Sequence, residues 1–285
     1  MQQVSDHCFA VLNQKNRVCD ANSGLINLAG GVVIDTQSDL AHARQMIELF
    51  GKVWTRMPQR VINTHEDAGH VSGNQLFKSA EIIAHRSVPD RMRAVADPRQ
   101  SQELTLPTTL FDVRYELYLD GTEVHLIYVG PCHQMGDTIV HLPKERVVFA
   151  GDVLFRQCTP MGWTGTYDKW FACLDLLLEL DPEVIVPGHG PLCGIEGACE
   201  MRAYLEYVRE ESRRCFNAGM TSLEAAKRIE FGPYGEWRAP ARLFMNVERA
   251  YREFRNEPAD APWDTAKTFE AICEVAIARG IPVEF

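Results

Sequence analysis

Four histidines and two aspartates of this sequence stand just after short apolar runs. They are His65, Asp67, His70, His133, Asp152 and His189. The first three follow the apolar pair Val61-Ile62 within one short segment, and each of the others follows an apolar run of its own. Such runs predict buried strands, and strands that deliver imidazole and carboxylate groups to one edge of a sheet can build a metal site. The sequence therefore predicts a metal centre.

The joint order of these six residues carries the prediction, because a single histidine beside a strand usually has a structural role. The other five histidines share no such placement: His7, His42, His85, His125 and His141. His85 ends the apolar run Glu81–His85 and could approach the site. We nevertheless expect a structural role for it.

In order and spacing, the six residues resemble the signature of the metallo-β-lactamase-fold hydrolases. That signature is H-x-H-x-D-H after a strand, then a lone histidine, then an aspartate in a Gly-Asp pair, then a histidine in a Gly-His-Gly turn. The matching segments here are His65-Glu-Asp67-Ala-Gly-His70, Gly130-Pro-Cys-His133-Gln-Met-Gly-Asp137, Gly151-Asp152 and Gly188-His189-Gly190. The resemblance runs from about Gly31 to Gly190. It implies an α/β fold, specifically a four-layer αββα sandwich.

The resemblance also implies how the ligands are shared between two metal ions. The first ion would be held by His65, Asp67 and His133, the second by His70 and His189, and Asp152 would bridge them. Imidazole and carboxylate ligands suit zinc best here, and iron and manganese also fit. We therefore expect one or two divalent metal ions, with zinc as the first choice.

Two positions depart from the family signature. Asp67 replaces the second histidine, which keeps a metal-binding group. Gly69 replaces an aspartate that binds the second metal in the family, and glycine offers no ligand. One interpretation is a weak or partly empty second site. The alternative is a backbone that needs glycine there, for a positive φ or for the close passage of a substrate.

A metal-dependent hydrolase is the leading interpretation of function. Metal-bound hydroxide would attack the carbonyl of an ester, thioester, lactone or amide, with Asp67 and Asp152 as catalytic residues. Glu66 is a second candidate proton handler, although we expect it to point away. We expect Trp163 and Tyr167, in the loop after Asp152, to line the substrate pocket.

We also make predictions for two residues that neighbour the ligands, and we keep two alternative functions. We expect Asp137 to orient a ligand histidine and Cys132 to be a packed thiol. A di-iron redox enzyme of the same fold is one alternative function, although the chain has no C-x-x-C pair. A relative that binds a metal or ligand without turnover is the other, and Gly69 is the reason to keep it.

The composition of the chain limits the classes of partner that we expect it to bind. A net charge of −10 argues against nucleic-acid and anionic-membrane partners. Basic residues do gather at Arg86, Arg91, Arg93 and Arg99, but acidic residues interrupt them. No signal peptide and no membrane-spanning apolar run is visible, and nine scattered cysteines predict reduced thiols in a cytoplasmic protein. A small-molecule substrate is the expected partner, and the oligomeric state is left open.

The hydrophobic pattern predicts alternating strands and helices before residue 195 and helices after it. The predicted strands are 8–12, 24–26, 31–35, 61–62, 81–85, 147–150 and 184–186, with a hairpin of Phe111–Leu119 and Glu123–Val129. The predicted helices are one opened by Ser38, Tyr167–Leu180, Cys199–Asn217, one opened by a capping box at Thr221–Glu224, Arg238–Phe254 and Asp264–Arg279. We predict a domain of residues 1–195 and a helical extension of residues 196–285 packed on it.

Overall fold

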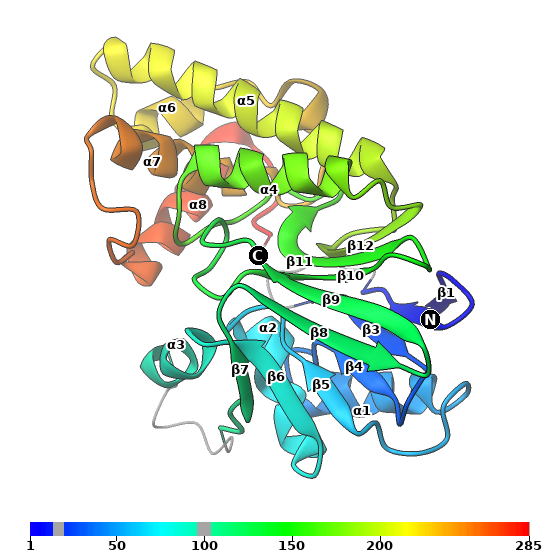
Figure 1. Ribbon diagram of the computed structural model, residues 1–285. Helices are drawn as coiled ribbons and strands as arrows, with labels where there is room; N and C mark the ends of the chain where they lie inside the picture. The colour runs from blue at the N-terminus through cyan, green and yellow to red at the C-terminus, as the bar shows by residue number, and fades with distance from the viewer. Residues whose placement is uncertain (14–19, 96–103, 285) are drawn as a thin grey trace.

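Two β-sheets pack face to face, with helices on both outer sides (Figure 1). This computed structural model describes residues 1–13, 20–95 and 104–284, and Arg99 lies outside these ranges. The arrangement confirms the predicted αββα sandwich and the helical C-terminal region.

The first sheet has seven strands that lie side by side in the order of the chain. They are β1 (Gln2–Gln3), β2 (Cys8–Val11), β3 (Ser23–Ile26), β4 (Val32–Ile34), β5 (Arg60–Ile62), β6 (Glu81–His85) and β7 (Thr109–Phe111). Strands β4 to β7 are parallel. The residues that follow β4 and β5 therefore leave the sheet at the same edge, and these include Asp35 and the segment His65–His70.

The second sheet has five strands in the order β12-β11-β10-β9-β8. They are β8 (Arg114–Leu119), β9 (Thr122–Tyr128), β10 (Thr138–Leu142), β11 (Val147–Phe155) and β12 (Val184–His189). Strands β8 to β11 form an antiparallel meander, and β12 is parallel to β11. The β9–β10 loop and the ends of β11 and β12 therefore meet at one edge.

The predicted hairpin is correct in its turn and wrong in its first strand. Asp120 and Gly121 both have positive φ angles, 49° and 85°, which a tight two-residue turn requires. The predicted strand Phe111–Leu119 is two strands, because Phe111 ends β7 in the first sheet and β8 begins at Arg114 in the second. The chain crosses between the sheets at residues 112–113.

Alternation along the strands separates the cores, because successive strand residues face opposite sides of a sheet. In β5, Val61 faces helix α1 (Leu40–Phe50), and Ile62 faces the space between the sheets. In β11, Val147 and Phe149 enter the space between the sheets, whereas Val148 and Ala150 face the outer helices. Both sheets are thus buried on two faces, as a four-layer fold requires.

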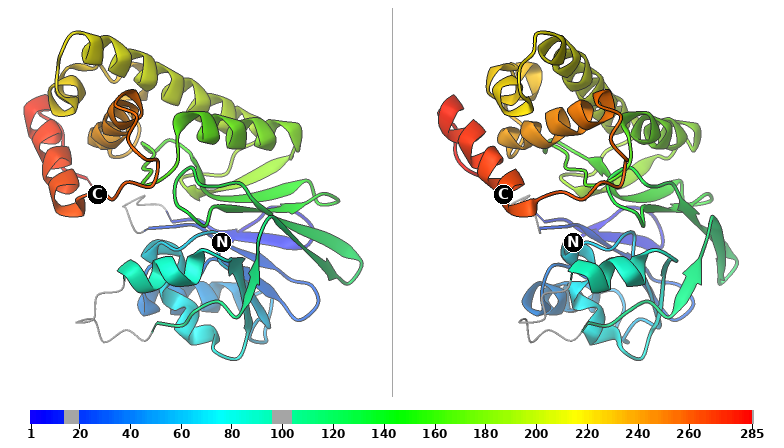
Figure 2. Two further views of the ribbon diagram at one scale, coloured as in Figure 1. Left: turned by 60° about the vertical axis from the view of Figure 1, so that its left-hand side comes forward. Right: turned by 90° about the vertical axis from the view of Figure 1, so that its left-hand side faces the viewer.

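The helices divide between the two outer faces (Figure 2). On the side of the first sheet are α1, α2 (Ala68–Val71), the 3₁₀ helix Ser72–Phe77 and α3 (Val88–Val95). On the side of the second are α4 (Tyr167–Glu179), α5 (Ile195–Asn217), α6 (Ser222–Arg228), the 3₁₀ helices Gly232–Tyr234 and Pro240–Arg242, α7 (Leu243–Phe254) and α8 (Thr265–Arg279). One hydrophobic cluster joins β11, α4 and the last four helices. The division at residue 195 remains a proposal.

Most helix ends agree with the predicted signals. The capping box at Thr221 and Glu224 is formed, and α8 stops at Gly280, whose φ is 63°. The cap of α1 is Asp39 rather than Ser38, and α7 begins at Leu243 rather than Arg238. Among the helices that the described residues form, none has the length and apolar character needed to cross a membrane.

Candidate metal centre

The six predicted ligands come together where the two sheets meet at a common edge. His65 and Asp67 lie in the segment that joins β5 to α2, His70 lies in α2, and His133 lies in the β9–β10 loop. His189 is the last residue of β12. Asp152 differs from its prediction, because it lies within β11 rather than after it. Its register against β12 shifts on both sides of Gly151, so this part of the strand is irregular.

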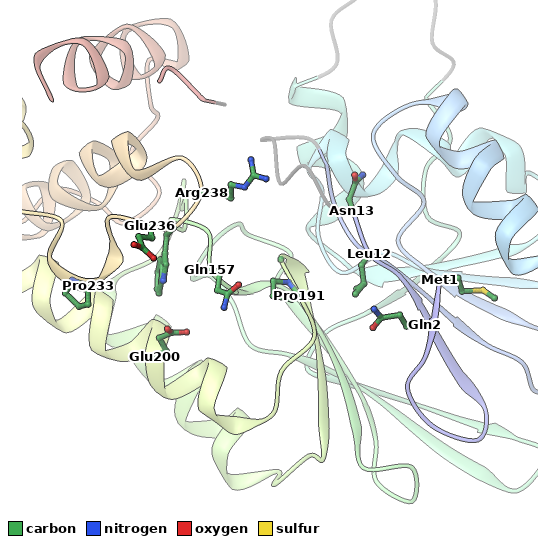
Figure 3. A pocket seen from close by; sticks show the side chains of 12 residues that line it. Met1, Gln2, Leu12, Asn13, Gln157, Pro191, Glu200, Pro233, Glu236 and Arg238 are labelled. Atoms are coloured by element: carbon green, nitrogen blue, oxygen red, sulfur yellow. The ribbon is translucent and has the colours of Figure 1, made fainter. Parts of the chain in front are cut away.

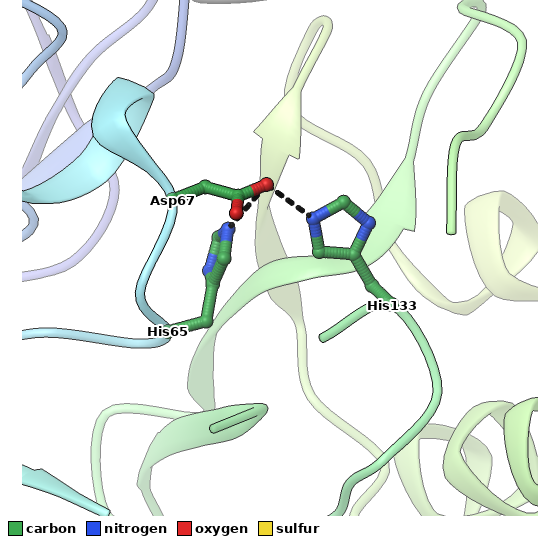
Figure 4. Close-up of side chains that lie close together, drawn as sticks. All are labelled: His65, Asp67 and His133. Carbon is green, nitrogen blue, oxygen red and sulfur yellow. Dashed lines mark hydrogen bonds and ion pairs between the residues drawn. The ribbon is translucent and has the colours of Figure 1, made fainter. Parts of the chain in front are cut away.

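Two overlapping groups of side chains could each hold a metal ion. They are His65, Asp67 and His133, and His65, His70 and Asp152; within each group the ligand atoms lie within 4.8 Å of one another. Figure 4 shows Asp67 between the other two members of the first group. Its Oδ2 atom is 3.1 Å from His133 Nε2 and 3.9 Å from His65 Nε2.

Asp152 is the centre of the cluster. Its Oδ2 atom lies 3.3 Å from Nε2 of both His133 and His189, and 3.9 Å from Nε2 of His65. Its Oδ1 atom lies 3.1 Å from His70 Nε2. One carboxylate therefore faces four imidazoles, which is the position that a bridging ligand needs.

Among the described residues, four buried atoms of the ligand side chains have no hydrogen-bond partner: His65 Nε2, His70 Nε2, Asp152 Oδ1 and His189 Nδ1. Buried polar atoms are nearly always paired in folded proteins. The first three of these atoms belong to residues whose ligand atoms lie within 4.8 Å of one another, and a cation bound by all three would explain why they lack other partners. Imidazole nitrogen and carboxylate oxygen suit zinc, iron and manganese, so the residues fit a divalent transition metal.

In three of the ligand histidines, a hydrogen bond at Nδ1 leaves the Nε2 atom available to a metal. His70 Nδ1 donates to Asp35 Oδ2 at 2.7 Å, and His133 Nδ1 donates to the Met161 carbonyl at 2.6 Å. Thr64 gives its own proton to Asp35, so its oxygen accepts from His65 Nδ1 at 2.9 Å. With the proton on Nδ1, the lone pair of each Nε2 faces the centre, as metal-binding histidines require.

The charge states of Asp152 and His65 suit a cation, whereas at His70 and His133 the lowering effect of burial is outweighed by nearby carboxylates, which raise the pKa of His70 and bring the pKa of His133 to about 9. Burial alone would raise the pKa of Asp152, but the surrounding His189, His70 and His133 hold that pKa well below its usual value. Burial, reinforced by His70 and His133, lowers the pKa of His65 well below its usual value. The carboxylate is therefore ionised and this imidazole neutral, the states in which both bind metals.

Asp35 is not among the predicted site residues, although a signal for it exists. The apolar run 31–34 ends on this aspartate at the same sheet edge as the other ligands. Its carboxylate accepts from His70, and also from the backbone and hydroxyl of Thr64. It therefore orients two ligand histidines at once.

We expect Asp35→Asn to weaken zinc binding by roughly 10- to 100-fold, because it removes the charge that orients His70. Asparagine tolerates the left-handed backbone, here with φ at 58°, so the fold should remain. Competition with a chromogenic chelator measures the affinity. Asp120→Asn is the matched control, since Asp120 also has a positive φ, 49°, and accepts from Ala29 far from the cluster. Equal affinity in both variants would contradict the role of Asp35.

The sequence model of the metallo-beta-lactamase superfamily matches residues 16–189 of this chain. This chain belongs to the metallo-β-lactamase superfamily. Members of the superfamily bind divalent metals, which agrees with the two groups of ligands.

Several curated relatives in the superfamily carry the names of enzymes. The chain is 31% identical to 2,4-dinitroanisole O-demethylase subunit alpha of Nocardioides sp. over 170 residues, which is 56% of this chain and 49% of that protein. It is 22% identical to linear primary-alkylsulfatase of Pseudomonas sp. over 258 residues, 72% of this chain and 49% of that protein. The chain thus spans about half the length of these two relatives.

Solved structures of the superfamily share the fold at low identity. A metallo-beta-lactamase family protein from Thermus thermophilus aligns with a TM-score of 0.67 at 16% identity, covering 88% of this chain and 93% of that one. The sec-alkylsulfatase Pisa1 from Pseudomonas sp. aligns with a TM-score of 0.65 at 16% identity, covering 98% and 56%. The second alignment includes the C-terminal helices.

Gly69, the departure from the superfamily signature, lies in helix α2 and is buried. Its backbone is helical, and it is not one of the glycines with a positive φ. The interpretation that the backbone needs glycine for a positive φ is therefore wrong. A missing ligand at the second metal site and the close passage of a substrate beside this glycine both stay predictions.

Two acidic residues beside the ligands hold the β9–β10 loop. Glu66 points away from the metal ligands, as predicted, and accepts from the backbone of Met135 and Gly136 at 3.1 and 3.0 Å. Burial raises its pKa to about 7. Asp137 accepts from three backbone amides, including that of His133 at 2.7 Å. It thus positions His133 through the backbone rather than through the ring.

Three other predicted residues are structural. Cys132 is buried, with its thiol 3.2 Å from Asp137. His85 stacks on Tyr128 with ring centroids 3.8 Å apart. Tyr167 is fully buried, and its hydroxyl donates to the Asn246 carbonyl at 2.9 Å. The prediction that Tyr167 lines the substrate pocket is therefore wrong, because it packs in the helical core.

Trp163 contacts the ligand His133 through its backbone. Its backbone amide donates to the carbonyl of His133 at 2.8 Å, and its ring packs on Trp263 and Phe269. The cavity that its side chain lines has a volume of about 30 Å³, which is enough for water but not for a substrate. A role for Trp163 in substrate binding stays a prediction.

A larger cavity, of about 850 Å³, lies beside the metal centre (Figure 3). Its lining includes Gln2 in β1, Asn13 after β2 and Glu200 on α5. Gly190, which directly follows His189, also lines it, but none of the six predicted ligands does. It is a neighbouring cavity and not the metal centre itself.

Proposed function

We propose that this protein is a metal-dependent hydrolase of small-molecule substrates, with zinc as its metal. The observation that carries the proposal is the convergence of three buried, unpaired ligand atoms, His65 Nε2, His70 Nε2 and Asp152 Oδ1. A divalent metal bound there supplies a Lewis acid and lowers the pKa of water.

The free thiols of the eight described cysteines support a cytoplasmic location.

The chain's own residues divide the work of holding the metals. In this proposal His65, Asp67 and His133 would hold the first ion, His70 and His189 would hold the second, and Asp152 would be a ligand of both. Asp35 and the Met161 carbonyl fix the rings of His70 and His133. The second site has fewer ligands, because Gly69 supplies none, and should bind more weakly.

Asp67 is the candidate for handling a proton. Its side chain is 31% exposed, whereas those of His65, His70, His133, Asp152 and His189 are at most 4% exposed. It is therefore the ligand that a substrate can approach. Gln134 donates to its Oδ1 atom at 2.5 Å and fixes its orientation. Its carboxylate can hold a proton and pass it to a leaving group.

The scissile group that we propose first is a carbonyl, in an ester, thioester, lactone or amide. The named relatives favour a second candidate, because one is an O-demethylase and another an alkylsulfatase. Substrates of both kinds should be assayed together, with a methyl aryl ether and a primary alkyl sulfate in the panel. We expect turnover of at least one class, lost on chelation and restored by zinc. No turnover with zinc, iron or manganese would contradict the proposal.

The Gly69→Asp variant should bind a second metal ion more tightly than the wild type. The substitution restores a carboxylate beside His70, and the helical backbone of α2 accepts aspartate without left-handed strain. Calorimetric titration of zinc into both proteins measures the second binding step. Gly69→Asn is the control, since it adds a side chain of similar size without a charge. Tight binding of two ions by the wild type would end the idea of a weak second site.

A further inference from the structure

Helix α7 turns one polar face toward the loops that carry the metal centre. The face consists of residues spaced three and four apart, which places them on one side of the helix: Asn246, Arg249 and Glu253. Asn246 donates to the Pro160 carbonyl at 3.0 Å, and Glu253 accepts from the Tyr167 amide at 2.7 Å. The face therefore holds the β11–α4 loop, residues 156–166, by its backbone.

Arg249 joins this loop to the one that contains His133. Its side chain is buried, with Nη1 donating to the Cys132 carbonyl at 2.6 Å and Nη2 donating to the Thr164 carbonyl. The guanidinium also lies 5.0 Å from the centre of the Trp170 ring. Its planar fork of donors can span two acceptors on different loops, which a lysine ammonium cannot do with the same geometry.

His133, in the β9–β10 loop, is held by the β11–α4 loop. Its ring donates to Met161 at 2.6 Å, and its carbonyl accepts from Trp163 at 2.8 Å. Cys132 precedes His133, and Thr164 follows Trp163 in the chain. Arg249 therefore links the residue before His133 to Thr164, whose own amide donates to the His133 carbonyl at 3.3 Å.

We infer that Arg249 is a positioning residue that fixes His133 for metal binding from the C-terminal helices. The inference rests on the proposed function. An apolar side chain of similar volume could fill the same space, but it would leave the carbonyls of Cys132 and Thr164 without their donor. A guanidinium is needed where two carbonyls on separate loops must be held together. In this inference the C-terminal helices help to position a ligand of the metal centre.

The test compares zinc affinity in the wild type with that in Arg249→Lys and Arg249→Met, measured by competition with a chromogenic chelator. We expect each variant to bind the first zinc at least about 10-fold more weakly, as when an outer partner of a ligand is lost. The matched control is Arg252→Met. Arg252 lies on the same helix, but its acceptors are the carbonyls of Ala261 and Pro262 and the carboxylate of Glu248. Its loss should lower thermal stability without changing zinc affinity.

A second variant keeps the inference testable if the Arg249 variants do not fold. A Cβ atom added at Gly162 would lie 2.7 Å from both Arg249 Nη2 and Trp170 Cζ3, so Gly162→Ala crowds the guanidinium and the ring beside it while keeping both. We expect weaker zinc binding there too. Wild-type zinc affinity in folded Arg249→Lys and Gly162→Ala would overturn the inference, and a wild type that binds no zinc would overturn both proposals. Weakened zinc binding in a protein that hydrolyses nothing would support the positioning role and contradict only the hydrolase.

Discussion

The Asp152→Asn variant is expected to lose more than about 100-fold of any hydrolytic activity, a larger loss than an outer partner of a metal ligand causes. The carboxylate lies within 3.3 Å of three ligand histidines, His70, His133 and His189, and its charge balances the metal rather than packing the core. Asparagine keeps the shape and removes the charge. The measurement is kcat/KM at saturating zinc, with circular dichroism to show that the fold remains.

The control for this variant is Asp175→Asn. Asp175 pairs with Arg202 on the surface of α4, where an ion pair contributes little to stability. It should leave both activity and metal content unchanged. A fully active Asp152→Asn protein would contradict the bridging role of Asp152 and require another residue to link the two groups of ligands.

His65→Ala and His133→Ala are each expected to abolish metal retention through gel filtration. His65 belongs to both candidate metal groups, and His133 belongs to the one that contains Asp67. Removing one of so few neutral nitrogen ligands leaves the remaining carboxylates without a complete site. Metal content is measured by elemental analysis of each purified variant.

A histidine outside the cluster provides the comparison. His125 lies on β9 beside His141 and Glu123, and belongs to neither metal group. His125→Ala should retain metal at the level of the wild type. If both ligand variants retained their full metal content, the assignment of the centre would be wrong.

The order of strands and ligands could be predicted because both depend on local pattern. The short runs before Asp35, His65 and His189 are buried strands of the two sheets, and parallel neighbours bring their ends to one edge. The crossing at residues 112–113 could not be predicted. The apolar pattern continues through it, and only the pairing of Phe111 with β6 reveals the change of sheet.

The residues that support the ligands are harder to predict than the ligands themselves. Arg249 lies more than a hundred residues after His133 in the chain, and its contacts are to backbone carbonyls, which carry no side-chain signal. The wrong prediction for Tyr167 has a related cause. An aromatic residue near a ligand loop has the same pattern whether it faces a substrate or, as here, the Asn246 carbonyl in the core.

The measurement that tests the central claim most directly is elemental analysis of the purified protein, before and after reconstitution with zinc. We expect about one tightly held divalent metal per chain, and a second that binds only in excess zinc and is lost on dialysis. Iron in place of zinc would favour the redox alternative. A protein that holds no metal even after reconstitution would contradict the assignment of His65, Asp67, His70, His133, Asp152 and His189 as a metal centre.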